Sequence, residues 1–93
     1  MQYRKRLQRL AETINNTNNT LTGVPIVELA GDRRVLIENH RGVIEYGAKQ
    51  ICVKVKCGSL CICGQNMELA KMTGEQLVIT GMIESVTIRR RGI

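Results

Sequence analysis

Four cysteines are the residues of this chain whose chemistry most directly suggests a function. They are Cys52, Cys57, Cys61 and Cys63. A structural zinc site usually takes paired C-x2-C ligands, and the spacing C-x3-C-x-C does not match that pattern. A free cysteine packs as a small hydrophobe, so we expect these four to be structural and predict no metal site and no cofactor. Neighbouring Lys54 and Lys56 keep redox sensing open as an alternative.

His40, the only histidine, is the second candidate for chemistry. It stands in Glu38-Asn39-His40-Arg41-Gly42, where Glu38 or the later Glu45 could orient a catalytic imidazole. The same stretch is ordinary turn chemistry between two strands, because Asn and Gly adopt left-handed backbone angles readily. No serine elbow, phosphate-binding glycine loop or H-E-x-x-H pattern is present. We therefore predict a turn here, no catalytic residue and no enzymatic activity.

A β-hairpin must position the cysteines. Gly58-Ser59 suits a two-residue turn, because type II′ turns favour glycine at their first central position. This register places Cys57 opposite Leu60, on an apolar face that also holds Val53, Val55 and Ile62. Cys52, Cys61 and Cys63 then lie on the other face. Four thiolates divided between two faces cannot surround one ion, which further disfavours a metal site.

A strand closed by a glycine recurs along the chain. Such units end at Gly31, Gly47, Gly64 and Gly81, at spacings of 16, 17 and 17 residues. A second short alternating run follows each one, and alternation with one apolar face indicates half-buried antiparallel strands. We predict an all-β domain over residues 24–89, a small antiparallel sandwich or roll of about eight short strands. A short β-solenoid is the alternative.

The two ends of the chain carry its excess of positive charge. The net charge is +6, while residues 15–88 hold seven basic and seven acidic residues. Apolar residues at 7, 10, 11 and 14 form one stripe and predict an amphipathic helix over residues 1–14. A polar linker (15–23) follows it, and a basic tail (90–93) ends the chain. The helix either packs on the β domain or docks to a membrane or partner through its basic residues, Arg4, Lys5, Arg6 and Arg9.

Several partners and locations are disfavoured by composition. A nucleic-acid-binding domain usually spreads basic residues over a folded face and stacks bases on aromatic rings. Here the body is neutral and the chain has no Trp and no Phe. No apolar run approaches the roughly 20 residues of a membrane span, and the first residues lack a secretory signal. We therefore expect a cytoplasmic protein that does not bind nucleic acid.

The stretch around His40 resembles a known family. Residues 35–42, Val-Leu-Ile-Glu-Asn-His-Arg-Gly, are similar to the I-E-N-H-x-G signature of the YabP/YqfC family, which are sporulation proteins of endospore-forming bacteria. Residues 25–31 resemble the start of the family's domain. Residues 58–64 and 77–83 resemble its two L-x-I-x-G elements. The resemblance covers residues 22–88, and the chain length agrees with the YqfC subgroup.

The resemblance implies a mother-cell protein without enzymatic activity, peripheral at the membrane around the forespore, with a membrane protein similar to YqfD as its partner. It makes Glu38, Asn39, His40 and Gly42 signature positions that serve a turn or a contact, and it supplies no catalytic residue. Our leading hypothesis is an interaction module docked through the basic helix and one sheet edge. The alternatives are a self-assembling component of a spore layer, which would be a homo-oligomer, and last a nucleic-acid binder.

Overall fold

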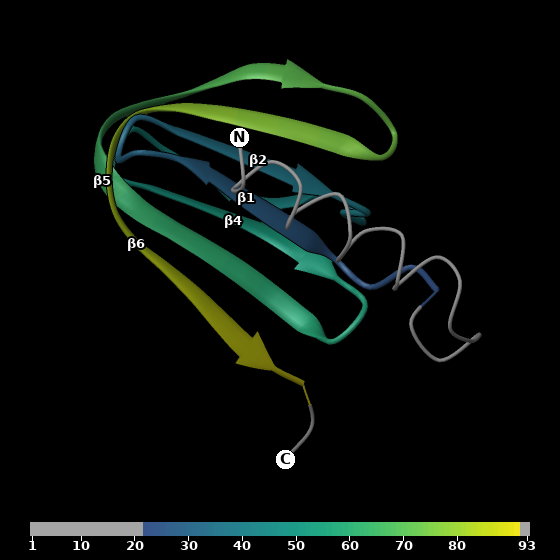
Figure 1. Cartoon of the computed structure of the whole chain (residues 1–93). Coiled ribbons are helices and arrows are strands. Elements are labelled where there is room, and N and C mark those ends of the chain that lie inside the picture. Colours follow the sequence, from purple (N-terminus) through teal and green to yellow (C-terminus); the bar gives the residue numbers. More distant parts are fainter. Residues whose placement is uncertain (1–21, 92–93) are drawn as a thin grey trace.

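A computed structural model describes residues 22–91 as six β-strands joined by turns (Figure 1). The strands are β1 (Ile26–Ala30), β2 (Arg34–Glu38), β3 (Val43–Tyr46), β4 (Gln50–Val55), β5 (Gly58–Met72) and β6 (Gln76–Arg90). The predicted helix over residues 1–14, with its four basic residues, lies outside the described residues. So do most of the predicted linker and the last two residues of the basic tail.

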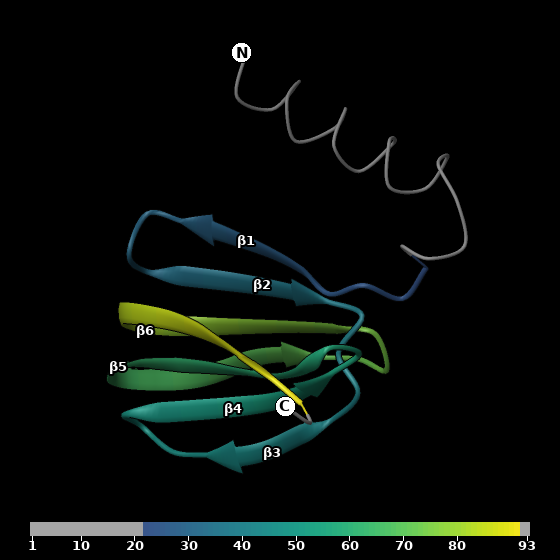
Figure 2. The ribbon, with the colours of Figure 1, turned by 90° about the horizontal axis from the view of Figure 1, so that it is seen from below.

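All six strands form one antiparallel sheet in the order β1-β2-β6-β5-β4-β3, which Figure 2 shows from below. The central strands β5 and β6 have 15 residues each and pair with one another along their length. The part of β6 that pairs with β2 is limited to residues 76–80, and the part of β5 that pairs with β4 is limited to residues 58–63. The sheet therefore has a β1–β2 half and a β3–β4 half, and the β5–β6 ribbon runs through both.

The β5–β6 ribbon doubles back on itself, so that the two halves of the sheet face each other (Figure 1). Its pairing shifts register between Cys63 and Gly64, and again between Gln65 and Glu68. A Cβ atom at Gly64 would collide with the carbonyl oxygen of Met82, and Gly81 has a φ of 139° that side-chain-bearing residues rarely adopt. Bulges bend a ladder, and glycine lets two backbones approach closely. The two glycines therefore make the bend possible.

The hydrophobic core lies between the two halves. Ten buried residues from β2, β4, β5 and β6 form one cluster: Val35, Ile37, Ile51, Val53, Val55, Leu60, Ile62, Met67, Leu77 and Ile79. None is aromatic, because the chain has no Phe and no Trp and Tyr46, the tyrosine of the described residues, is exposed. The predicted antiparallel all-β class is confirmed. The described residues form one open sheet, however, and neither a sandwich of two separate sheets nor a solenoid.

The prediction of about eight short strands was wrong because two pairs of predicted runs are continuous. Residues 60–64 and 67–69 both belong to β5, and residues 77–81 and 83–88 both belong to β6. A glycine between two apolar runs usually indicates a turn. Here it indicates a bend within a strand whose ladder continues on both sides.

The recurring glycines gather on one side of the molecule. The β1–β2 turn, the β3–β4 turn and the bend of the ribbon all lie on that side in Figure 2. Hydrogen bonds join them: the Gly81 amide donates to Arg33 O at 3.1 Å, and the Gly64 amide donates to Lys49 O at 3.0 Å. In each unit of 16 or 17 residues the chain therefore runs away from this side along one strand and returns to it along the next.

The β4–β5 hairpin turns at Lys56-Cys57, two residues before the predicted turn. Val55 pairs with Gly58 where the sequence predicted Ile62, and Cys57 is exposed in the turn instead of buried. Gly58 instead allows β5 and β6 to approach closely, because a Cβ atom there would collide with the carbonyl oxygen of Arg89 on β6. The predicted core face is nevertheless right, since an even shift of register keeps every side chain on its face.

Candidate functional site

The signature stretch around His40 connects the two halves of the sheet. It leaves the end of β2 and enters β3, which belongs to the other half. The Asn39 amide donates to Glu75 O in the β5–β6 turn at 2.7 Å, and the Arg41 amide donates to Lys54 O in β4 at 2.7 Å. Backbone hydrogen bonds therefore fix this link to both halves at once.

The His40 side chain is 7% exposed and uses both ring nitrogens. The Gly42 amide donates to Nδ1 at 3.0 Å, and Nε2 lies 2.8 Å from the carbonyl oxygen of Thr73. Because Nδ1 accepts, the ring proton is on Nε2, which donates to Thr73. The imidazole thus ties the link to the end of β5, and neither nitrogen binds Glu38 or Glu45. The catalytic arrangement considered from the sequence is not formed.

Asn39 supports the same link in two ways. Its φ of 65° lies in the left-handed region, which asparagine tolerates better than most residues. Its side-chain amide donates to Val24 O at 2.9 Å, which holds the segment before β1 against the link. Gly42 also has a positive φ, of 118°, while Glu38 pairs with Ile26 and Gln76 in the sheet. Asn39, His40 and Gly42 therefore build a turn in the described structure, and Glu38 ends the strand that leads into it.

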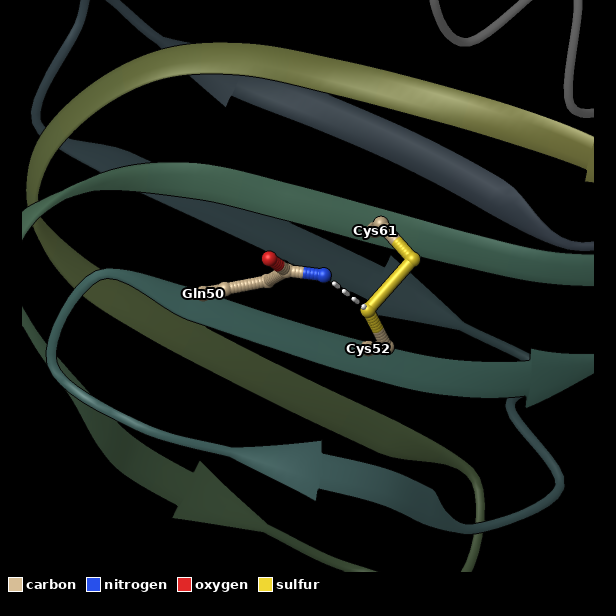
Figure 3. Close-up of a disulfide and its surroundings, with 3 residues drawn as sticks. All are labelled: Gln50, Cys52 and Cys61. Atoms are coloured by element: carbon tan, nitrogen blue, oxygen red, sulfur yellow. Dashed lines mark hydrogen bonds between the residues drawn. A yellow bond between two sulfur atoms is a disulfide. The ribbon is translucent and has the colours of Figure 1, made fainter.

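Two of the cysteines form a disulfide between β4 and β5 (Figure 3). Cys52 and Cys61 are direct partners in the ladder and are 5% and 2% exposed. Gln50 donates a hydrogen bond from Nε2 to Cys52 Sγ at 3.1 Å. Cys63 pairs with Gln50, so Cys52, Cys61 and Cys63 share a face as predicted. We expected all four cysteines to be free and to pack as small hydrophobes. A predicted turn at residues 56–57 would have placed Cys52 opposite Cys61 and so revealed the disulfide.

A shallow, open depression surrounded by basic residues lies where β6 ends. Its lining includes Lys54, Arg89, Arg90, Arg91 and the exposed Ile44, and we call it the basic groove. Lys54 and Arg89 are both partners of Ser59, so they project from the same face of the sheet. The ion pair present within residues 22–91 joins Arg33 to Asp32 in the β1–β2 turn, so it does not neutralise the basic groove. The sequence prediction noted the arginines of the tail but not their meeting with Lys54, which requires the pairing of β4, β5 and β6.

Between residues 22 and 91, no group of three or more His, Cys, Asp or Glu side chains is arranged to hold a metal ion. In the same part of the chain, no helix has the length and apolar character needed to cross a membrane.

Comparison with known proteins agrees with the resemblance around His40. The model of the YabP family matches residues 15–92. The uncharacterized protein YqfC of Bacillus subtilis (strain 168) is 25% identical over 68 residues, which are 73% of this chain and 73% of that protein. No solved structure matches. The matched region holds the whole sheet, the link through His40 and the basic groove.

Proposed function

The chain belongs to the YabP family, and on this premise we propose that it is a non-enzymatic protein of spore formation that works as an interaction module. It acts in the mother cell and docks to a membrane partner at the membrane around the forespore. The basic groove is the observation that carries the docking. The sporulation role rests on the family resemblance of residues 25–42, 58–64 and 77–83.

The basic groove suits an acidic surface. Lys54 and the three arginines at 89–91 present four positive charges without a carboxylate of the described chain among the lining residues. Guanidinium groups bind carboxylates and phosphates through two parallel hydrogen bonds, which makes arginine the stronger choice for such partners. Exposed Ile44 adds an apolar contact beside these charges. Anionic headgroups, or acidic segments of a membrane protein similar to YqfD, offer the complementary chemistry.

The N-terminal segment supplies a second basic element. Arg4, Lys5, Arg6 and Arg9 lie outside the described residues, and the proposal assigns them to the same membrane surface. Each Lys or Arg near an anionic bilayer contributes about 1 kcal/mol of binding free energy. The two basic elements together would therefore hold the protein at the membrane more strongly than either alone.

Binding to lipid vesicles tests the docking. The full chain should sediment with vesicles of phosphatidylglycerol and phosphatidylcholine and remain soluble with phosphatidylcholine alone. The triple variant Arg89→Gln, Arg90→Gln, Arg91→Gln should lose most of this binding. A matched control, Arg34→Gln, Lys49→Gln, Lys71→Gln, removes the same charge from other exposed positions and should retain it. Equal loss in the two variants would mean that net charge alone acts, and would overturn a role for the groove.

Deleting residues 1–14 tests the second basic element separately. The truncated chain should bind the same anionic vesicles more weakly and keep the unfolding transition of the β domain. Equal binding by the truncated and full chains would show that residues 1–14 do not dock. In sporulating cells, fluorescence microscopy should place a fusion of the full chain at the membrane around the forespore.

A self-assembling component of a spore layer is the second candidate. It is favoured by the strand edges that have no partner within residues 22–91, since an unpaired edge is a template for another chain. Light scattering against concentration separates the two candidates, because a structural layer requires growth to large species.

A further inference from the structure

An open, mostly apolar groove lies between β1 and β6, beside the β1–β2 turn. We call it the β1–β6 groove, and its lining residues are Leu29, Gly31, Asp32, Ile83, Glu84, Ser85 and Val86. Ile83 and Val86 pack against the hydrophobic core but are only partly buried, and Leu29 is 45% exposed. The groove therefore presents apolar side chains that residues 22–91 leave partly uncovered.

The strands on the two sides of this groove are not paired with each other. Strand β1 is an outer strand of the sheet and pairs with β2. Within the described chain, residues 85–90 of β6 pair with β5 alone. A further segment of polypeptide can therefore occupy the β1–β6 groove without displacing any strand of the sheet.

The charged residues that line the groove are both acidic. Asp32 and Glu84 are exposed, and the lining contains no Lys or Arg. Arg33 Nε lies 3.9 Å from Asp32 Oδ1, while the two side chains are 73% and 76% exposed. An exposed pair of this kind contributes about 0–1 kcal/mol, so it leaves Asp32 able to meet another cation. The groove suits a segment that combines apolar and basic residues.

The first 14 residues of the chain have that composition. They contain an apolar stripe at positions 7, 10, 11 and 14. They also contain four bases and one acid, Glu12, so their side chains carry a charge of +3. The lining of the β1–β6 groove carries −2. The segment and the groove are therefore complementary both in apolar character and in charge.

The chain before β1 is long enough to bring residues 1–14 to the groove. The described chain begins at Thr22, whose carbonyl oxygen accepts a hydrogen bond from Lys56 Nζ at 2.7 Å. From Val24 to Leu29 the strand direction advances about 16 Å. The seven residues 15–21 span up to about 23–25 Å when extended, so they can run back along β1 and place the preceding residues beside Leu29.

We propose that residues 1–14 dock within the same molecule in the β1–β6 groove when no membrane is present. Their apolar stripe lies on its aliphatic residues, and their bases lie beside its two carboxylates. The inference rests on the proposed function, because the same segment leaves the groove for an anionic membrane. A short tether gives an effective concentration on the order of mM, so a contact weak enough for a bilayer to displace is still occupied. The groove thus competes with the membrane for residues 1–14.

Cross-linking of the full chain without lipid tests the docking. With Cys57→Ser and Cys63→Ser as background, Leu10→Cys combined with Leu29→Cys should form an intramolecular disulfide under mild oxidation. The control combines Leu10→Cys with Tyr46→Cys, since Tyr46 is 58% exposed and lies on β3 at the opposite edge of the sheet. The first pair should react at least tenfold faster. Equal rates overturn the docking. A disulfide between two chains also overturns it, because the groove then holds the segment of a second copy.

Removing the two carboxylates tests the charge matching. Asp32→Asn with Glu84→Gln should slow the cross-link to position 29 at least fivefold. Glu68→Gln with Glu75→Gln is the matched control, because it removes the same charge from exposed residues outside the groove, and it should change the rate less than twofold. Equal slowing in the two backgrounds would mean that net charge alone acts, and would overturn the groove as the docking site.

Vesicle binding tests the competition with the same two charge variants, without the added cysteines. Asp32→Asn with Glu84→Gln should bind vesicles of phosphatidylglycerol and phosphatidylcholine at least threefold more tightly than Glu68→Gln with Glu75→Gln, because residues 1–14 are released from the groove. Equal binding overturns the competition. The cross-linking experiment contains no lipid, so its failure is distinct from a failure of membrane docking, which would appear as loss of vesicle binding by the unmodified chain.

Discussion

Cys52 and Cys61 face each other across β4 and β5 with their Cα atoms 4.1 Å apart and are joined by a disulfide. The bond closes a short hairpin, with nine residues of separation along the chain. It also lies on the face of β4 opposite the aliphatic core, so this face of the hairpin is held by a covalent bond. Cys57 and Cys63 are free thiols.

Counting thiols checks this pairing. The purified chain, unfolded without a reducing agent and alkylated, should gain two alkyl groups, and after reduction it should gain four, since Cys57 and Cys63 are the free pair. Mass spectrometry of the intact chain makes the measurement. Four groups without reduction would show that the disulfide does not form under those conditions.

Removing the disulfide should lower stability. Cross-linking a loop of this length reduces the entropy of the unfolded chain by an amount worth about 2–3 kcal/mol. Cys52→Ala with Cys61→Ala should therefore reduce the free energy of unfolding in urea by about that much. Cys63→Ala is the matched control, because it removes a thiol from the same face without breaking the bond. If both changes lower the free energy of unfolding equally, the loss of stability comes from side-chain packing and not from the disulfide.

His40→Ala should destabilise the fold by about 2–4 kcal/mol, because it leaves the Gly42 amide and the Thr73 carbonyl without their partner. Arg41→Ala, at the exposed neighbouring position, should change stability little. Urea unfolding of the two variants makes the comparison. If the His40→Ala protein is as stable as the wild type, the imidazole is not needed to hold the turn and would be available for another role.

Asn39 allows its two contributions to be separated. Asn39→Gly keeps the positive φ and loses the hydrogen bond to Val24, which should cost about 1 kcal/mol. Asn39→Ala loses both and should cost about 1 kcal/mol more, the penalty of a left-handed residue with a Cβ atom. Thermal unfolding should rank the wild type above Asn39→Gly and Asn39→Gly above Asn39→Ala. A reversed order of the variants would contradict the backbone argument.

The bend of the ribbon should not tolerate a side chain. Gly81→Ala would place Cβ 2.8 Å from the carbonyl oxygen of Asn66, at a φ that alanine resists, and should cost about 3 kcal/mol or more. Gly74→Ala is the control, since its Cβ would meet nothing within 4 Å. Circular dichroism during heating should show a large loss for the first change only. Similar melting of both variants would mean that the ribbon can relax at the bend.

The faces of the strands could be read from the sequence, but their pairing could not. Alternation identified Val53, Val55, Leu60 and Ile62 as core residues, and all four are buried. The same alternation is unchanged when a hairpin shifts by an even number of residues, so it could not exclude the wrong turn at Gly58. The wrong turn hid that Cys52 and Cys61 are opposite each other, and the expectation of free, packed cysteines gave no reason to look for a disulfide.

Long-range pairing set the remaining limits. The glycines at 64 and 81 look like strand ends, and only the partners of β5 and β6 on both sides of the bend show continuous strands. The basic groove likewise brings Lys54 beside Arg89 through an intervening strand. The link at Asn39-His40, by contrast, was predictable as a turn, because turn preference is local chemistry.

The shared ribbon has a consequence for synthesis of the protein. Strand β6 emerges last of the six, yet β2 depends on its residues 76–80 for pairing outside the β1–β2 hairpin. Val35 and Ile37 would stay solvated in the nascent chain until Leu77 and Ile79 arrive. Folding of the sheet must therefore be cooperative and must follow the emergence of β6, and the chain without β6 is the form most exposed to aggregation and proteolysis.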